Sequence, residues 1–298
     1  MPSSTTSPAR CCLTGDRLSG LDAVERQRQF AVTFARQNGG RTFLRRQHVG
    51  YPFHVGRALY LPGDPEGFCT VYMQSCSGGI FQHERLGVVA VADPDAWAHL
   101  TTGAATVVHS MPEGYAEQDV LLDARAGSLI EYVPDALILF PDSRLDARLT
   151  IRAHRDATVI AAESFLLHDP RGDRRPFDWL RSETRVEDEQ GRVLALDRFR
   201  VDGSAMQAGV PGVDGGFALQ ATLMVVHPQD PDAALVALRE ACAGEHGAYA
   251  GASLLPNGAG AWMRALSNDA VGLRGLIRDA WSVARWKLRG LAAGVRRK

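Results

Sequence analysis

"SLIEYVPDALILFPDSRLDARLTIRAHRDATVIAAESFLL", residues 128–167, contains four short segments rich in β-branched, leucine and aromatic residues. Pro-Asp pairs and a His-Arg-Asp group separate these segments. Short runs of such residues between turn formers are typical of β-strands. The stretch therefore predicts strands at 128–133, 137–140, 148–153 and 158–167.

The same pattern continues on both sides of this stretch. Further predicted strands are AVTFARQ (31–37), FCTVYMQS (68–75), LGVVAVAD (86–93), ATVVHS (105–110), RVLALDRFRV (192–201) and FALQATLMVVH (217–227). A regular succession of short strands and turn signals predicts a mainly β body. No segment recurs at a fixed length, so the sequence pattern alone does not indicate a regular solenoid.

After Pro228 the spacing of apolar residues changes from two to 3.6, which is the period of a helix. Asp230 is placed to cap a helix of about a dozen residues that ends at Gly244. The segments AYAGASLL (248–255) and AWMRALS (261–267) then predict two strands.

A second helix is predicted over 268–293, with an apolar stripe on one side. The stripe consists of Leu273, Ile277, Ala280, Trp281, Ala284, Leu288 and Leu291. Four arginines are expected mostly off the stripe, namely Arg274, Arg278, Arg285 and Arg289. The stripe should cover the β body, and the arginines form either a solvated basic face or a contact for a partner.

Composition excludes several classes of function. The 298 residues have a net charge of −1, so no overall field attracts nucleic acid or an anionic membrane. Lysine occurs only at Lys287 and Lys298. A phosphate-binding loop of the Walker type needs a lysine after its glycines, and a Schiff-base mechanism needs one in the main body. We therefore expect neither nucleotide hydrolysis nor Schiff-base chemistry.

Five cysteines without a C-x-x-C pair fit a reducing compartment rather than a disulfide framework. The N-terminus has no apolar run of signal-peptide type, and no window approaches 18 consecutive apolar residues. We expect a cytoplasmic protein that contacts neither membrane nor nucleic acid. Residues 1–20 are predicted to form a disordered tail, and 21–298 a single domain.

A doubled His-Val-Gly in RRQHVGYPFHVGRALYLP, residues 45–62, raises the question of a metal site. On one extended strand His48 and His54 would lie roughly 20 Å apart, too far to share an ion. The segment is better interpreted as two strands joined by a Gly-Tyr-Pro turn.

No motif of a known catalytic site is present: there is no H-E-x-x-H, no G-x-S-x-G, no G-x-G-x-x-G after a strand and no zinc-ligand spacing. Possible metal ligands are dispersed along the chain, at Cys69, Cys76, His83, Glu84, His109, Glu163 and His168. The charged segment 168–192 is interpreted as a solvated excursion or sheet edge, with a docking loop as the alternative.

Six motifs in order give the chain a family resemblance from about residue 22 to about 290. They are QHVGYPFHVGRALYLP (47–62), SGGIFQHERL (77–86), LTTGAATVVHS with IEYVPDALILF (100–140), AYAGASLL (248–255), MRALSND (263–269) and RDAWSVAR (278–285). In this order and spacing they resemble the urease accessory protein UreD family, called UreH in some bacteria.

The resemblance implies a β-helix-like stack of strands with two C-terminal helices, acting as a scaffold without enzyme activity. It implies three partners: a UreF-type accessory protein, a UreG-type GTPase and the urease apoprotein. It also implies transient nickel(II), passed through an internal route, with no tightly bound cofactor.

Two carboxylates are the residues we expect on that route. Glu84 falls where the family has an acidic residue after its Gly-Gly segment, and Glu163 falls at an acidic position in a central strand. Other motif positions are Gly78, Gly79, Thr101, Thr102, Tyr132, Pro134, Tyr249, Gly251 and Ser253. For both carboxylates a structural ion pair with a nearby arginine is the alternative.

Three departures mark the chain as a divergent member of the family. LLHDPRGDRRPFDW (166–179) replaces a usual L-G-R-x-x-x-G-E segment, Glu84 replaces Asp, and the Pro-Arg-x-Trp finish is missing. Two other functions remain open: a nickel-binding assembly module for another metalloenzyme, and a hydrolase on a β scaffold.

Overall fold

The computed structural model describes residues 28–37, 40–210 and 215–296. The predicted tail at 1–20 and the predicted start of the domain at residue 21 lie outside these ranges. None of the helices in the described ranges has both the length and the apolar character needed to cross a membrane.

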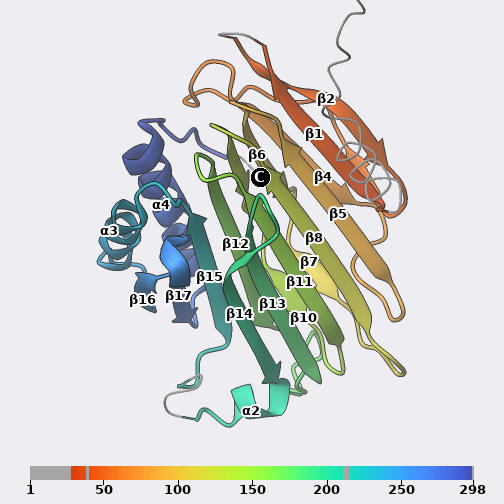
Figure 1. Ribbon diagram of the computed structural model, residues 1–298. Coiled ribbons are helices and arrows are strands. Elements are labelled where there is room, and N and C mark those ends of the chain that lie inside the picture. The colour runs from red at the N-terminus through yellow and green to blue at the C-terminus, as the bar shows by residue number, and fades with distance from the viewer. Residues whose placement is uncertain (1–27, 38–39, 211–214, 297–298) are drawn as a thin grey trace, which may run out of the picture.

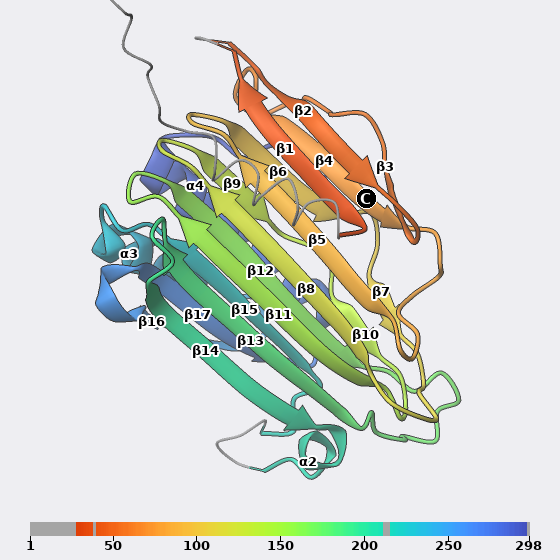
Figure 2. The same ribbon diagram turned by 45° about the vertical axis from the view of Figure 1, so that its right-hand side comes forward.

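The described residues fold into two facing β-sheets (Figures 1 and 2). The seven-stranded sheet has the spatial order β14 (Val193–Asp202), β13 (Trp179–Asp188), β11 (Arg144–Ala153), β8 (Ala116–Ala124), β5 (Arg85–Ala92), β1 (Phe30–Arg36) and β2 (Thr42–Val49). The ten-stranded sheet has the order β16 (Ala248–Leu254), β17 (Gly260–Ser267), β15 (Leu219–Val226), β12 (Thr158–Leu167), β9 (Leu129–Tyr132), β6 (Trp97–Thr102), β4 (Cys69–Ser75) and β3 (Phe53–Val55). Off this order, β10 (Leu137–Leu139) pairs with β12, and β7 (Thr106–Val108) pairs with β10.

The central strands wind as a solenoid, because the chain alternates between the two sheets and each strand pairs in parallel with its counterpart one turn later. Arg85 lies beside Glu117, Glu117 beside Asp146, and Asp146 beside Arg181. The steps between these partners are unequal, which explains why the sequence shows no fixed repeat. The prediction of a mainly β, β-helix-like stack is confirmed.

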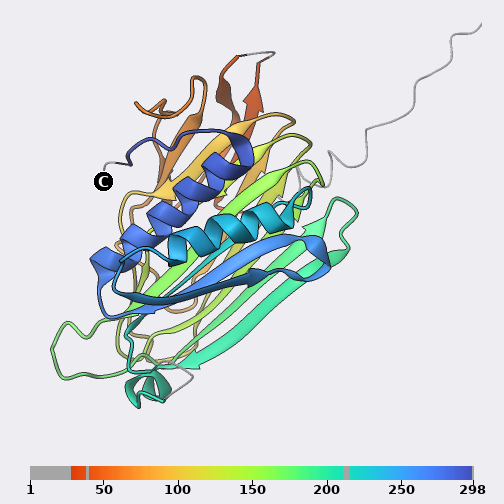
Figure 3. The same ribbon diagram turned by 90° about the vertical axis from the view of Figure 1, so that its left-hand side faces the viewer.

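Two C-terminal helices, α3 (Pro231–Cys242) and α4 (Ala270–Arg289), cover the outer face of the ten-stranded sheet (Figure 3). The side chain of Asp230 accepts a hydrogen bond from Ala233 N at 2.9 Å, so the predicted cap of the first helix is confirmed. The second helix ends earlier than predicted, because Gly290 takes a left-handed conformation. Leu291 therefore lies beyond the helix. Two short elements, α2 (Gly203–Gln207) and the 3₁₀ turn Pro256–Gly258, complete the chain.

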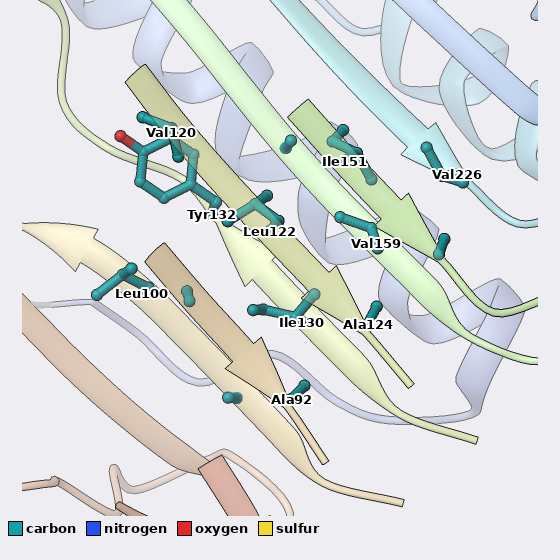
Figure 4. Packing of buried hydrophobic residues seen from close by; sticks show 14 of the residues in the cluster. Ala92, Leu100, Val120, Leu122, Ala124, Ile130, Tyr132, Ile151, Val159 and Val226 are labelled. Atoms are coloured by element: carbon teal, nitrogen blue, oxygen red, sulfur yellow. The ribbon is translucent and has the colours of Figure 1, made fainter. Parts of the chain in front are cut away.

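Alternation of side chains along each strand builds two apolar layers. Val159 and Ala161 of β12 point between the sheets, whereas Ile160 and Ala162 point toward the helices. In Figure 4, Val120, Leu122 and Ala124 of β8 meet Ile130 and Tyr132 of β9 in the interior. The inner layer has two clusters, one around Leu122 and Ile130 and another around Leu145 and Phe165.

The interpretation of 168–192 as an exposed excursion or edge is wrong for its second half. Residues 179–188 form β13, which lies between β11 and β14 within the seven-stranded sheet. Leu180, Ser182, Thr184 and Val186 of this strand are buried. The charged side chains alternate with them and point to the outer face.

The doubled His-Val-Gly segment folds as two strands, as predicted. β2 ends at Val49 and β3 begins at Phe53, with a cis Tyr51-Pro52 bond between them. His48 pairs with Ala31 in one sheet and His54 with Gln74 in the other. The two imidazoles therefore belong to different sheets and form no site together.

Candidate functional site

A cavity of about 520 Å³ lies between the sheets, where the two inner clusters do not meet. Val120, Tyr132 and Leu149 of one cluster line it, together with Ala147 and Phe165 of the other. It reaches the surface at segment 74–78, where most residues are exposed. The core thus has an internal space with an opening at the end of β4.

Glu163 supplies a carboxylate to this cavity. It follows Val159 and Ala161 on the inward face of β12, so the strand's alternation aims it between the sheets. Thr184 Oγ1, on the opposite sheet, donates a hydrogen bond of 2.8 Å to its Oε2. Burial raises the pKa of Glu163, and the nearby Asp197 carboxylate raises it further, while the Thr184 hydrogen bond lowers it.

The nearest guanidinium is already engaged elsewhere. Arg264 Nη2 lies 2.6 Å from Asp197 Oδ2, and Arg264 Nε donates to Thr222 Oγ1 at 3.3 Å. Among the described residues no arginine, lysine or histidine forms an ion pair with Glu163. Its carboxylate is therefore a half-buried acceptor without a direct ion pair, although the more distant charge of Arg264 lowers its pKa. It faces a space large enough for a hydrated cation.

Five of the family-motif positions lie in the cavity wall. Gly78, Gly79, Thr102, Tyr132 and Pro134 all line it. Thr102 Oγ1 accepts a hydrogen bond from the backbone N–H of the residue after Pro134, at 2.8 Å. Burial, together with the charge of the cavity carboxylate, raises the pKa of Tyr132, so its hydroxyl remains protonated.

Thr101 lies directly behind the wall. It is buried, and its Oγ1 donates to Val133 O at 2.6 Å. This bond joins β6 to the end of β9, which positions the next residues of both strands along the cavity.

The two glycines at the opening allow a matched test of this wall. Both have positive φ, but a Cβ at Gly79 would lie 2.5 Å from Val107 O, whereas one at Gly78 would meet nothing within 4 Å. We expect Gly79→Ala to cost about 2 kcal/mol or more of unfolding free energy and Gly78→Ala about 1 kcal/mol. Urea unfolding of both variants measures the difference, and equal losses would contradict the tight packing at Gly79.

The structure does not bring Glu84 to Glu163. Glu84 lies in the turn before β5, where its Oε2 accepts a hydrogen bond from Phe81 N at 2.9 Å. With Arg85 and Glu117 it lines a separate shallow depression rather than the cavity. Its neighbour His83 has φ 64° and is exposed. The two residues therefore lie in a turn and not on a strand.

The other predicted positions are dispersed. Tyr249, Gly251 and Ser253 lie on β16, away from the cavity wall. Burial raises the pKa of Cys69 to about 12, which makes its thiol a poor ligand. Within the described ranges no three His, Cys, Asp or Glu side chains are grouped as a metal centre.

The structure contains a buried charge cluster that was not predicted from the sequence. Arg285 is fully buried; its Nη1 lies 2.8 Å from Asp64 Oδ1 and its Nε 2.9 Å from Glu131 Oε1. His99 Nδ1 lies 2.8 Å from the other Glu131 oxygen, and Arg296 Nη1 lies 2.9 Å from Asp64 Oδ2. The expectation that Arg285 lies off the apolar stripe is therefore wrong.

The helical spacing of the sequence around Arg285 could have predicted its buried position. Arg285 follows Trp281 by four positions and precedes Leu288 by three, so it lies on the stripe of α4. A single arginine at a core position indicates a buried acidic partner, because an unpaired buried charge is too costly.

The fold and the cavity together define a class: a β-solenoid-like protein with a carboxylate-bearing space between its sheets and two helices on the outer face of one sheet. The family model described as UreD urease accessory protein matches residues 27–298. The chain therefore belongs to the UreD family of urease accessory proteins.

Several relatives share this description over most of their length. The chain is 42% identical over 276 residues to "Urease accessory protein UreD 1" of Pseudomonas syringae pv. syringae, covering 92% of this chain and 97% of the relative. It is 37% identical to the protein of that name from Methylorubrum populi, covering 92% and 93%. It is 32% identical to "Urease accessory protein UreD" of Haloarcula marismortui, covering 90% and 89%.

Proposed function

We propose that the chain is a non-catalytic maturation factor that delivers nickel(II) to the urease apoprotein through the internal cavity. The observation that carries this proposal is the Glu163 carboxylate, which faces the cavity without a direct ion pair. Nickel is cargo in this account, and no tightly bound cofactor is required.

A transit site must hold its ion and also release it. One carboxylate, with the hydroxyl of Thr184 beside it and room for water, offers few ligands to a divalent ion. The raised pKa of Glu163 keeps the empty site closer to neutral, and an arriving cation favours the ionised form. These ligands therefore favour brief binding of the nickel ion rather than its storage.

The proposed partners are a UreF-type accessory protein, a UreG-type GTPase and the urease apoprotein. Family membership supports a role with urease. The chain has no lysine before Lys287 for a phosphate-binding loop, so a separate GTPase would supply nucleotide hydrolysis. The proposed site of action is the cytoplasm, because the cysteine usage suits a reducing compartment.

Deletion of the gene tests the proposal. Relatives carry the numbers 1, 2 and 3, so the test strain must lack every other copy. We expect urease from the deletion strain to be assembled but nearly free of nickel, and the tagged chain to co-purify with the two accessory partners from the parent. Full nickel occupancy in urease from the deletion strain would contradict the proposal.

A further inference from the structure

The main strand orders of the two sheets have four edges, and three of these are protected against pairing with another strand. β2 exposes Arg45, Arg46 and His48, and β14 carries Arg198 and Arg200 on its exposed side. β3 is only three residues long. Charged side chains and short length are the usual means by which soluble proteins block an open edge.

The fourth edge, β16, has none of these protections. Its seven residues, AYAGASL, contain no charge and no proline. Its pairing with β17 runs from Ala248 to Leu254 without a register shift, so no bulge turns the strand away. In Figure 1 it lies at the margin of the ten-stranded sheet, next to α3.

Backbone groups on this edge point outward in a regular row. Leu255 N donates to Gly260 O at 2.8 Å, so residues 249, 251 and 253 face β17 by the same alternation. The N–H and C=O groups of four residues therefore face away from β17: Ala248, Ala250, Ala252 and Leu254. These are the groups that an added antiparallel strand would bond.

The side chains of β16 suit a copy of the same strand. The three alanines pack toward the helices, and Tyr249, Gly251 and Ser253 are exposed, with Tyr249 at 74%. A Cβ at Gly251 would meet nothing within 4 Å, which leaves a bare patch of backbone. An aromatic ring covers such a glycine well from a diagonal position on a neighbouring strand.

We propose that β16 pairs antiparallel with β16 of a second copy of this chain, about a two-fold axis at Gly251. Tyr249 then lies opposite Ser253 of the second copy and diagonal to its bare Gly251. Ala250 pairs with Ala252 of the second copy through the outward backbone groups, and no charge meets a like charge. This contact joins the two ten-stranded sheets and does not depend on nickel delivery.

The axis position makes a specific cross-linking prediction. Two copies of Gly251→Cys would face each other in a non-hydrogen-bonded pair with Cα atoms about 4.5 Å apart, within disulfide range. Two copies of Ser253→Cys would be four residues out of register, about 13 Å apart, beyond that range. Both variants are made in the full chain with Cys11, Cys12 and Cys76 changed to serine.

Under mild oxidation we expect Gly251→Cys to give a reducible dimer and Ser253→Cys to remain monomeric. Sedimentation velocity should show a reversible dimer for the wild-type chain, weakened at least about tenfold by Gly251→Lys, which opposes two ammonium groups. Val271→Lys, on the exposed start of α4, is the control and should leave the dimer unchanged. Equal cross-linking of the two cysteine variants, or a wild-type monomer up to about 100 µM, would overturn the proposal.

Discussion

Replacing Arg285 with methionine is expected to lower the free energy of unfolding by about 3–5 kcal/mol, the usual cost of breaking a buried ion pair. The guanidinium is fully buried, 2.8 Å from Asp64 and 2.9 Å from Glu131. Although burial alone would raise it, Arg285 holds the pKa of Glu131 below its ordinary value. Without Arg285, Glu131 retains His99 as a partner, and Asp64 retains Arg296 and the Gly294 N–H.

A matched exposed arginine on the same helix gives the control. Arg274→Ala should change the free energy of unfolding by less than about 0.5 kcal/mol. Adding Glu131→Gln to Arg285→Met should recover part of the loss, because one uncompensated charge disappears. Urea unfolding followed by circular dichroism measures all three, and a loss below about 1 kcal/mol for Arg285→Met would show that the cluster contributes little to stability.

Replacing Glu163 with glutamine is expected to lower the nickel content of urease about tenfold or more while leaving partner complexes intact, because the amide keeps the shape but not the charge. Glu183→Gln is the matched control: Glu183 lies on β13, points to the outer face and pairs with Arg198. Glu84→Gln tests the second predicted carboxylate separately. Normal nickel loading with Glu163→Gln would exclude Glu163 as a transit ligand.

Glu163→Gln should raise the free energy of unfolding, whereas Arg285→Met should lower it. The folded-state pKa of Glu163 is raised, so its contribution to stability is present at low pH and is lost as the pH rises through that pKa. The variant should therefore be more stable than the wild type at neutral pH. The difference should vanish in acid, where Glu163 is protonated and resembles the amide. Urea unfolding of both proteins at neutral pH and in acid measures this difference in stability.

Most strands with an apolar pattern were predicted from the sequence, whereas β6, β8 and β13 were not. Two of these strands, β8 (AEQDVLLDA) and β13 (WLRSETRVED), alternate buried residues with charged ones. In a single segment this pattern indicates a surface position. In the sheet these charges neutralise each other across neighbouring strands: Arg148 of β11 lies 3.7 Å from Asp119 of β8, and Arg181 of β13 lies 3.3 Å from Asp146 of β11. Such pairing depends on register, which a single segment does not reveal.

The candidate site was predictable only in part. The family resemblance predicts Glu163 at an acidic position in a central strand, and in the structure Glu163 lies on β12 and lines the cavity. The cavity itself arises where two apolar clusters fail to meet, and that depends on the packing of side chains from β8, β9, β11 and β12. Glu84 was grouped with Glu163 from its motif alone, but a turn holds it outside the wall.

The C-terminal residues have a practical consequence for work with this protein. Gly294 N donates to Asp64 at 2.8 Å, and Arg296, only 8% exposed, pairs with the same carboxylate. Gly294 and Arg296 are thus tied to a buried carboxylate, unlike the free ends to which affinity tags and fluorescent fusions are usually attached. A fusion joined directly after Arg296 would therefore strain the Asp64 cluster.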